Sequence, residues 1–236
     1  MIALSVVLPA LNEADNLALM VRRVATVLDG LGITGEIIVV DDGSTDGTAA
    51  VAASLPVTLL CHPRNRGYGA ALRTGFAAAR GQRIFFTDSD QQFDLAELAG
   101  LLHAAERADI AVGYRQVRRD PLYRRLNAAA WGGLVRRLFA LPVRDINCAF
   151  KVFRREVVEQ IELCSTGAFI NTELLARAQA AGFTIAEIPV GHYTRPTGQA
   201  TGARPAVILQ AFRELIALRE EVQPRSRVSG PRARPH

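Results

Sequence analysis

Two carboxylates, Asp88 and Asp90, stand one residue apart directly after an apolar run that is typical of a buried strand, Arg83 to Thr87. Side chains two residues apart on a strand share a face, so both can point the same way where the strand ends. Open α/β sheets bind ligands at these ends. Paired carboxylates there suit a hard divalent cation that also holds substrate phosphates. The alternative is an acidic turn that caps the next helix.

Polar residues also follow the three preceding strands of the pattern: Asn12-Glu13, the cluster Asp41 to Ser44, and the loop Asn65 to Gly69. Each turn alone could cap a helix. Four polar strand ends on one sheet edge favour a nucleotide site, because carboxylates accept hydrogen bonds from ribose hydroxyls and base N–H groups.

An arginine-rich segment follows the apolar run that ends at Gly113, and Asp120 is its single acid. Its members are Arg115, Arg118, Arg119, Arg124, Arg125, Arg136 and Arg137. Arginine binds phosphate in a bidentate manner, so a phosphate-rich ligand is one interpretation and a solvated helix face is the other. No nucleic-acid motif or aromatic interleaving accompanies the arginines, and we expect no nucleic-acid partner.

The elements that position these residues alternate in type along the first half of the chain. Apolar runs predict strands, and the segments between them have helical spacing. The expected strands are 4–9, 36–40, 57–61, 83–87, 110–113, 151–153 and 185–190. The expected later helices are 95–107, 124–139, 170–181 and 205–222. This order predicts an α/β fold with a mostly parallel, doubly wound sheet flanked by helices.

The 236 residues are 49% hydrophobic and 22% charged, with a net charge of +5, as in ordinary globular proteins. We expect one domain over 1–222, with a nucleotide-sugar-binding half (1–113) and an acceptor-side half (114–222), and a disordered basic tail over 223–236. No apolar run approaches the ~18 residues of a spanning helix, and the N-terminus lacks a signal-peptide pattern. Three widely spaced cysteines favour a reducing, cytoplasmic setting.

Four ordered motifs together resemble the family-two glycosyltransferases, in particular the branch that transfers mannose or glucose to dolichol or polyprenyl phosphate. They are Val6 to Glu13, Val39 to Thr48, Arg66 to Ala71 and Asp88 to Gln92. Further similarity extends through Val112 to Arg115, Tyr123 to Arg125, Asp145 to Phe153 and Thr172 to Leu175, so that it covers about 3–215. The resemblance implies an A-type glycosyltransferase fold that binds a GDP- or UDP-hexose and a polyprenyl-phosphate acceptor.

The resemblance also implies roles for individual residues. The residues expected to line the nucleoside pocket are Pro9, Leu11, Glu13 and Asp42, with Asp88 against the nucleotide. Asp90 and Gln92 are expected to hold Mg²⁺ or Mn²⁺ on the diphosphate. Arg115 and Arg124 are expected to contact the donor or acceptor phosphates, and Arg195 is expected in a basic loop near the active site. Two departures from the branch, the loop end Gly198 to Thr201 and Ala149, bear on acceptor identity.

The expected reaction is an inverting displacement at the anomeric carbon of the sugar. A lipid phosphate is already an anionic nucleophile and needs no base, whereas a hydroxyl acceptor needs one, for which Asp145 and Glu173 are the candidates; both could instead be structural. A sugar nucleotidyltransferase or a non-enzymatic nucleotide-binding module are more distant alternatives. Access to a lipid acceptor at the cytoplasmic membrane face would need helix 205–222, the basic tail or a membrane-protein partner.

Overall fold

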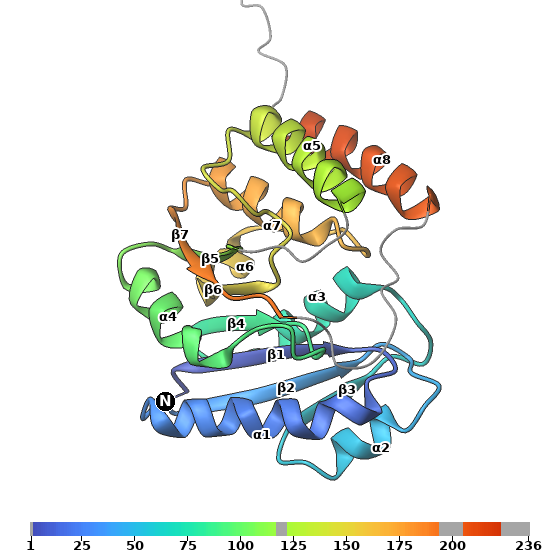
Figure 1. Cartoon of the computed structure of the whole chain (residues 1–236), viewed down its shortest axis with the longest axis vertical. Coiled ribbons are helices and arrows are strands. Elements are labelled where there is room, and N and C mark those ends of the chain that lie inside the picture. The colour runs from blue at the N-terminus through green and yellow to red at the C-terminus, as the bar shows by residue number, and fades with distance from the viewer. Residues whose placement is uncertain (1, 117–121, 194–204, 223–236) are drawn as a thin grey trace, which may run out of the picture.

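A seven-stranded sheet forms the centre of the protein, in a computed structural model that describes residues 2–116, 122–193 and 205–222 (Figure 1). The strand order is β3-β2-β1-β4-β6-β5-β7. The strands are β1 (Leu4–Ala10), β2 (Gly35–Asp41), β3 (Thr58–Cys61), β4 (Arg83–Thr87), β5 (Ile110–Arg115), β6 (Phe150–Arg154) and β7 (Ile185–Val190). Every expected strand is present, with ends within two residues of the prediction.

Helices connect the strands and cover both faces of the sheet. They are α1 (Ala14–Gly30), α2 (Thr48–Ala53), α3 (Tyr68–Ala78), α4 (Leu98–Glu106), α5 (Leu122–Phe139), α6 (Arg155–Gln160), α7 (Ile170–Ala180) and α8 (Pro205–Val222), with a 3₁₀ turn at Leu95–Glu97. In Figure 1, α1 and α2 lie on one side of β1 to β3 and α3 lies on the other. The short α6 was not predicted, because six residues are too few to show helical periodicity.

Strand direction determines where the polar strand ends meet. Strand β1 pairs parallel with β2 and β4, β2 pairs parallel with β3, and β5 pairs parallel with β7. Strand β6 is antiparallel to both of its neighbours, β4 and β5. All the described strands except β6 therefore run in one direction, and their carboxyl ends share one edge of the sheet. The mostly parallel, doubly wound sheet predicted from the sequence is confirmed.

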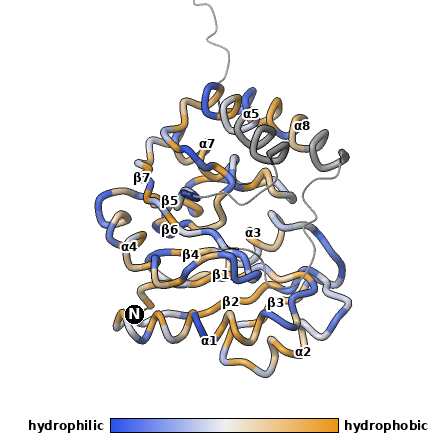
Figure 2. The backbone as a smooth tube through the Cα atoms, viewed as in Figure 1, coloured by the Kyte–Doolittle hydropathy of each residue, from blue (hydrophilic) through white to orange (hydrophobic). Residues whose placement is uncertain are grey.

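The core explains why the strands are nearly continuous apolar runs. Every residue of β1 is buried, and the central residues of β2 and β4 have almost no exposed surface. Strands covered on both faces lose the alternation of half-buried strands. Phe153 meets the ring of Phe76 edge-on, with centroids 5.2 Å apart. Figure 2 shows this pattern as hydrophobic colour along β2, with hydrophilic colour in loops beyond the strands.

Of two predicted C-terminal segments, one is described only in part and the other lies outside the described residues. The tail 223–236 lies outside the described residues. Helix α8 has the predicted bounds, but the side chains of 205–210, like those of 122–129 in α5, are not described. Within the described ranges, no helix is both long and apolar enough to cross a bilayer.

Candidate active site

The ends of β1, β2 and β4 are joined by polar contacts at the carboxyl edge of the sheet. The Asp42 amide donates to the Ala10 carbonyl at 2.9 Å. The Asn12 amide donates to Ser44 Oγ at 2.9 Å, and Ser89 Oγ donates to the Pro9 carbonyl at 2.9 Å. The prediction that these polar strand ends share one edge is confirmed, because the parallel register brings them together.

Asp88 and Asp90 lie at the centre of this edge, just past the end of β4. Burial and then repulsion from Asp90 raise the pKa of Asp88 from 3.8 to about 7, although Tyr68, Lys151 and Arg115 act to lower it. Asp90 is buried, and its Oδ1 accepts the Gln92 amide at 3.1 Å. Two carboxylates that repel each other in a buried turn form a local excess of negative charge, which a cation would relieve.

The donor set of this turn fits a hard divalent cation. Carboxylate and amide oxygens are the preferred ligands of Mg²⁺ and suit Mn²⁺. Among the described residues, no group of three or more His, Cys, Asp or Glu side chains is arranged to hold a metal by itself. Mg²⁺ is usually held by one or two carboxylates together with substrate phosphates rather than in a closed protein cage.

Gln92 joins the Asp-x-Asp turn to the end of β7. Its amide nitrogen donates to the Tyr193 carbonyl at 3.0 Å, and the Tyr193 amide donates back to the Gln92 carbonyl at 2.8 Å. A metal role for Gln92 would therefore use its side-chain oxygen. The same pairing brings His192 close to the turn, where its ring packs against Phe93 with centroids 5.4 Å apart. His192 was missed from the sequence because it lies about a hundred residues away.

Asp42 anchors the loop that follows β3. Its carboxylate accepts the amides of Arg66 at 2.9 Å and Gly67 at 2.8 Å, and it lies 2.6 Å from His62 Nδ1. His62 Nε2 lies 2.9 Å from Thr74 Oγ1. A nucleoside contact through this carboxylate would need the exchange of one of these partners. The structure therefore gives Asp42 a loop-anchoring role that the sequence did not indicate.

The other predicted nucleoside residues line the same edge. Pro9 is buried at the end of β1, and its carbonyl accepts from Ser89. Leu11 is 39% exposed, an unusual position for leucine and a surface on which a base could pack. Glu13 is buried, and its Oε2 accepts Asn16 Nδ2 at 2.7 Å.

Arg115 and Asp145 form a bidentate ion pair at the end of β5. Arg115 Nε donates to Oδ2 at 2.6 Å and Nη2 donates to Oδ1 at 2.9 Å. Both oxygens of Asp145 are thus engaged by one guanidinium, a geometry that disfavours Asp145 as a general base. The charge of Arg115 nevertheless acts on Asp88, so this pair belongs to the same site.

Glu173, the other candidate base, is 2% exposed and has several donors. Its carboxylate accepts the Cys164 amide at 3.0 Å, the Ser165 amide at 2.8 Å and Arg177 Nε at 2.9 Å. Such contacts hold the segment before α7 against that helix. They support the structural alternative for Glu173.

Two residues that sequence analysis did not select, Lys151 and Tyr68, act on Asp88. The Lys151 ammonium group donates to Asn171 Oδ1 at 2.7 Å and to the Cys148 carbonyl. The Tyr68 hydroxyl lies near Asp88 and Asn171 without hydrogen-bond geometry to any described group; burial and then Asp88 raise the pKa of Tyr68 well above 10. A single charge inside the apolar run Phe150 to Phe153 was the signal that could have identified Lys151.

Two arginines predicted for the active site, Arg124 and Arg195, cannot be placed by their side chains. Arg124 lies in α5 within the segment whose side chains are not described, and Arg195 lies outside the described residues.

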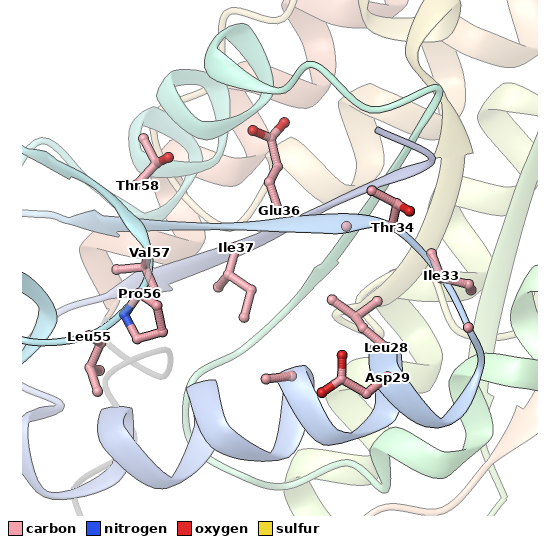
Figure 3. Close-up of a pocket in the computed structure, with 13 residues that line it drawn as sticks. Leu28, Asp29, Ile33, Thr34, Glu36, Ile37, Leu55, Pro56, Val57 and Thr58 are labelled. Atoms are coloured by element: carbon pink, nitrogen blue, oxygen red, sulfur yellow. The ribbon is translucent and has the colours of Figure 1, made fainter. Parts of the chain in front are cut away.

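A cavity at the opposite edge of the sheet is unrelated to this site. It has a volume of about 790 Å³ and lies between the end of α1, the start of β2 and the loop before β3 (Figure 3). A second cavity of about 480 Å³ lies between α3 and α6. Neither is lined by Asp88, Asp90 or Arg115.

The comparison with known families agrees with the site. Residues 5–162 match the model of glycosyl transferase family 2, and the chain belongs to this family. Glycosyltransferase AglD of Haloferax volcanii is 35% identical over 204 residues, covering 80% of this chain and 33% of that protein. Undecaprenyl-phosphate 4-deoxy-4-formamido-L-arabinose transferase of Edwardsiella ictaluri is 32% identical over 202 residues, covering 83% and 61%.

A third relative, dodecaprenyl-phosphate galacturonate synthase of Rhizobium johnstonii, is 30% identical over 208 residues, covering 83% of this chain and 60% of that protein. The chain thus spans between one third and about three fifths of the length of these relatives. Two of the three names specify sugar transfer involving a polyprenyl phosphate, the branch that the sequence motifs indicated.

Solved structures show the same fold. Mannosyl-3-phosphoglycerate synthase from Rubrobacter xylanophilus has a TM-score of 0.75 at 20% identity, covering 99% of this chain and 79% of that chain. Glucosyl-3-phosphoglycerate synthase from Mycobacterium tuberculosis, solved with Mn²⁺, UDP and glucosyl-3-phosphoglycerate, has a TM-score of 0.69 at 22% identity, covering 93% and 79%. The protein has the A-type glycosyltransferase fold.

Proposed function

We propose that this glycosyltransferase moves a hexose from a nucleotide-diphosphate sugar to a polyprenyl phosphate, with inversion at the anomeric carbon. The proposal rests on the meeting of Asp88, Asp90 and the Arg115–Asp145 pair at one sheet edge, where carboxylates can hold a cation and arginine can hold phosphate. The names of the relatives support the acceptor class.

The donor, a GDP- or UDP-hexose, would place its nucleoside along Pro9, Leu11, Glu13 and the Asp42 loop. Asp88 would lie against the nucleotide, while Asp90 and Gln92 would hold Mg²⁺ or Mn²⁺ with the diphosphate. When bound, the cation would stabilise negative charge on the departing nucleoside diphosphate. Arg115, fixed by Asp145, would orient the phosphates, and Arg124 and Arg195 are proposed to assist.

The acceptor phosphate oxygen would form a bond to the anomeric carbon as the bond from that carbon to the diphosphate oxygen breaks. The electron pair leaves with the nucleoside diphosphate, and no proton has to be removed from the nucleophile. The occupied carboxylates of Asp145 and Glu173 support this base-free route over a hydroxyl acceptor.

A lipid acceptor requires contact with a membrane, and we place α5 and α8 toward it. Leu134 of α5 and Phe212 and Ile216 of α8 are exposed, and the Trp131 ring meets Phe212 edge-on at 5.1 Å. Both helices follow strands whose carboxyl ends lie at the active-site edge (Figure 1). An exposed apolar helix face is suited to interfacial binding. The proposed location is the cytoplasmic face, peripherally or with a membrane-protein partner.

A donor and acceptor panel tests the function. GDP-, UDP- and dTDP-hexoses are first screened by thermal shift with and without Mn²⁺. Transfer of radiolabelled hexose is then measured to a short, detergent-dispersed polyprenyl phosphate and to the matching polyprenol. We expect transfer to the phosphate and none to the alcohol. Metal-independent stabilisation by every donor, or transfer only to hydroxyl groups, would overturn the proposal.

A further inference from the structure

Lys151, the only lysine of the chain, has no exposed surface and lies in the antiparallel strand between the two halves of the sheet. In the strand register it is opposite Phe86 of β4 and Val112 of β5. Strand β4 leads into Asp88 and Asp90, and β5 ends at Arg115. Lys151 therefore lies between the strands that carry the carboxylates and the arginine of the site.

The contacts of Lys151 connect both sides of the site. Its ammonium group donates to the Cys148 carbonyl and to Asn171 Oδ1, and it lies 5.3 Å from the centroid of the Phe86 ring. The Cys148 amide in turn donates to the Asp145 carbonyl at 3.3 Å, and this hydrogen bond closes a turn that begins at Asp145. The Asp145 carboxylate accepts from Arg115. One ammonium group thus ties the Arg115-bearing side of the site to the start of α7.

Charge and burial indicate that packing alone does not require a lysine here. Burying an ammonium group has a large desolvation cost, so a lysine at this position needs hydrogen bonds and nearby negative charge to offset it, which an apolar side chain would not need. Burial lowers the pKa of Lys151 to about 8, while the charges of Asp145 and Asp88 favour its protonated form. Its positive charge also acts on Asp88, as does that of Arg115.

We propose that Lys151 is a positioning residue for glycosyl transfer. By hydrogen bonds it holds the turn that fixes the Arg115–Asp145 pair, and by its charge it holds the Asp88 carboxylate beside Asp90. Arg115 and Asp88 thereby keep a constant separation while phosphates enter between them. Small displacements of a phosphate-binding group reduce turnover strongly, since the reacting atoms lose alignment. This inference rests on the proposed function.

Lys151→Met is the test variant, because methionine fills a similar volume without charge or hydrogen bonds. Phe153→Leu is the matched control, since Phe153 is two residues along β6 on the same face, equally buried, and packs on Phe86 farther from the site. Melting temperature, kcat and the KM for the donor are measured for each. We expect Lys151→Met to remain folded and lose about 100-fold or more in kcat, with the donor KM changed less than about threefold. We expect Phe153→Leu to have a lower melting temperature and an unchanged kcat.

Asn171→Ala keeps the inference testable if Lys151→Met does not fold. This change removes one hydrogen-bond acceptor of Lys151 and leaves its charge, so we expect about a tenfold loss of kcat. If Lys151→Met folds and retains the wild-type kcat, the inference is overturned. If Lys151→Met does not fold, a wild-type kcat in Asn171→Ala overturns it. An equal kcat loss in Phe153→Leu does the same, because general packing would then explain it. A wild-type enzyme that transfers no hexose from any donor overturns the proposed function as well.

Discussion

The Arg115–Asp145 pair allows a double-mutant cycle that separates positioning from proton transfer. If Asp145 acts only by holding Arg115, its loss should matter only while Arg115 is present. In Asp145→Asn one amide oxygen replaces two carboxylate oxygens that accept at 2.6 and 2.9 Å from the guanidinium. Loss of one charged hydrogen bond in this largely buried pair costs about 2 kcal/mol. At about 2–4 °C per kcal/mol for a chain of this size, the melting temperature should fall by about 4–8 °C.

The kinetic expectation follows from the same contacts. A misplaced guanidinium can cost up to about 100-fold in kcat, so Asp145→Asn alone cannot distinguish the two roles. In an Arg115→Ala background, base-free transfer predicts that adding Asp145→Asn changes kcat by less than about threefold. Catalysis by a general base predicts a further loss of about 100- to 10,000-fold.

The assay is single-turnover transfer to polyprenyl phosphate at saturating donor and metal, below the melting temperature of the weakest variant. Melting curves serve as the internal control. Arg115→Ala leaves the buried Asp145 carboxylate without its arginine partner, and adding Asp145→Asn removes that charge, so the double variant should have a higher melting temperature than Arg115→Ala alone. A double variant at least 100-fold slower than Arg115→Ala would refute the base-free mechanism.

Three further outcomes are expected. Asp90→Asn should abolish the Mn²⁺-dependent part of donor-induced thermal stabilisation and reduce kcat by about 1,000-fold, and retention of metal dependence would contradict its assignment. Glu173→Gln should lower the free energy of unfolding in urea by about 3 kcal/mol, because a buried acceptor of amide and Arg177 N–H groups loses its charge. The folded fraction should keep a normal kcat, and a selective loss of kcat would make Glu173 a candidate base again. Hydrogen bonds from the backbone and then the side chain of Thr184 lower the pKa of Asp109. Its stabilising contribution should therefore be complete well above the unfolded-state pKa of 3.8 and be lost as the pH falls through the folded-state pKa, and Asp109→Asn should flatten the stability curve in that acid range.

Much of the fold could be read from local patterns. Apolar runs ending in Asn12-Glu13, Asp41-Asp42 and Asp88-Ser89-Asp90 determined strands, turns and the edge where they meet, because parallel strands place like ends together. The antiparallel insertion of β6 was not readable, since a five-residue strand carries no signal for its direction or neighbours.

Side-chain partners were decided only by tertiary structure. Asp42, Asp145 and Glu173 looked equally available in the sequence, yet each carboxylate is engaged by donors in the fold. The donors to Asp42 and Asp145 lie 25 and 30 residues away, whereas those to Glu173 come from the segment before α7 and from the next turn of that helix. Lys151 and Tyr68 lie inside stretches that resemble the family but were given no role from the sequence, because their relation to Asp88 arises from the packing of β6 and α3 against β4. Residue type and spacing thus determined which chemistry the edge can support. Long-range packing decided which of its charges face one another, because hydrogen bonds and burial depend on neighbours that local sequence does not specify.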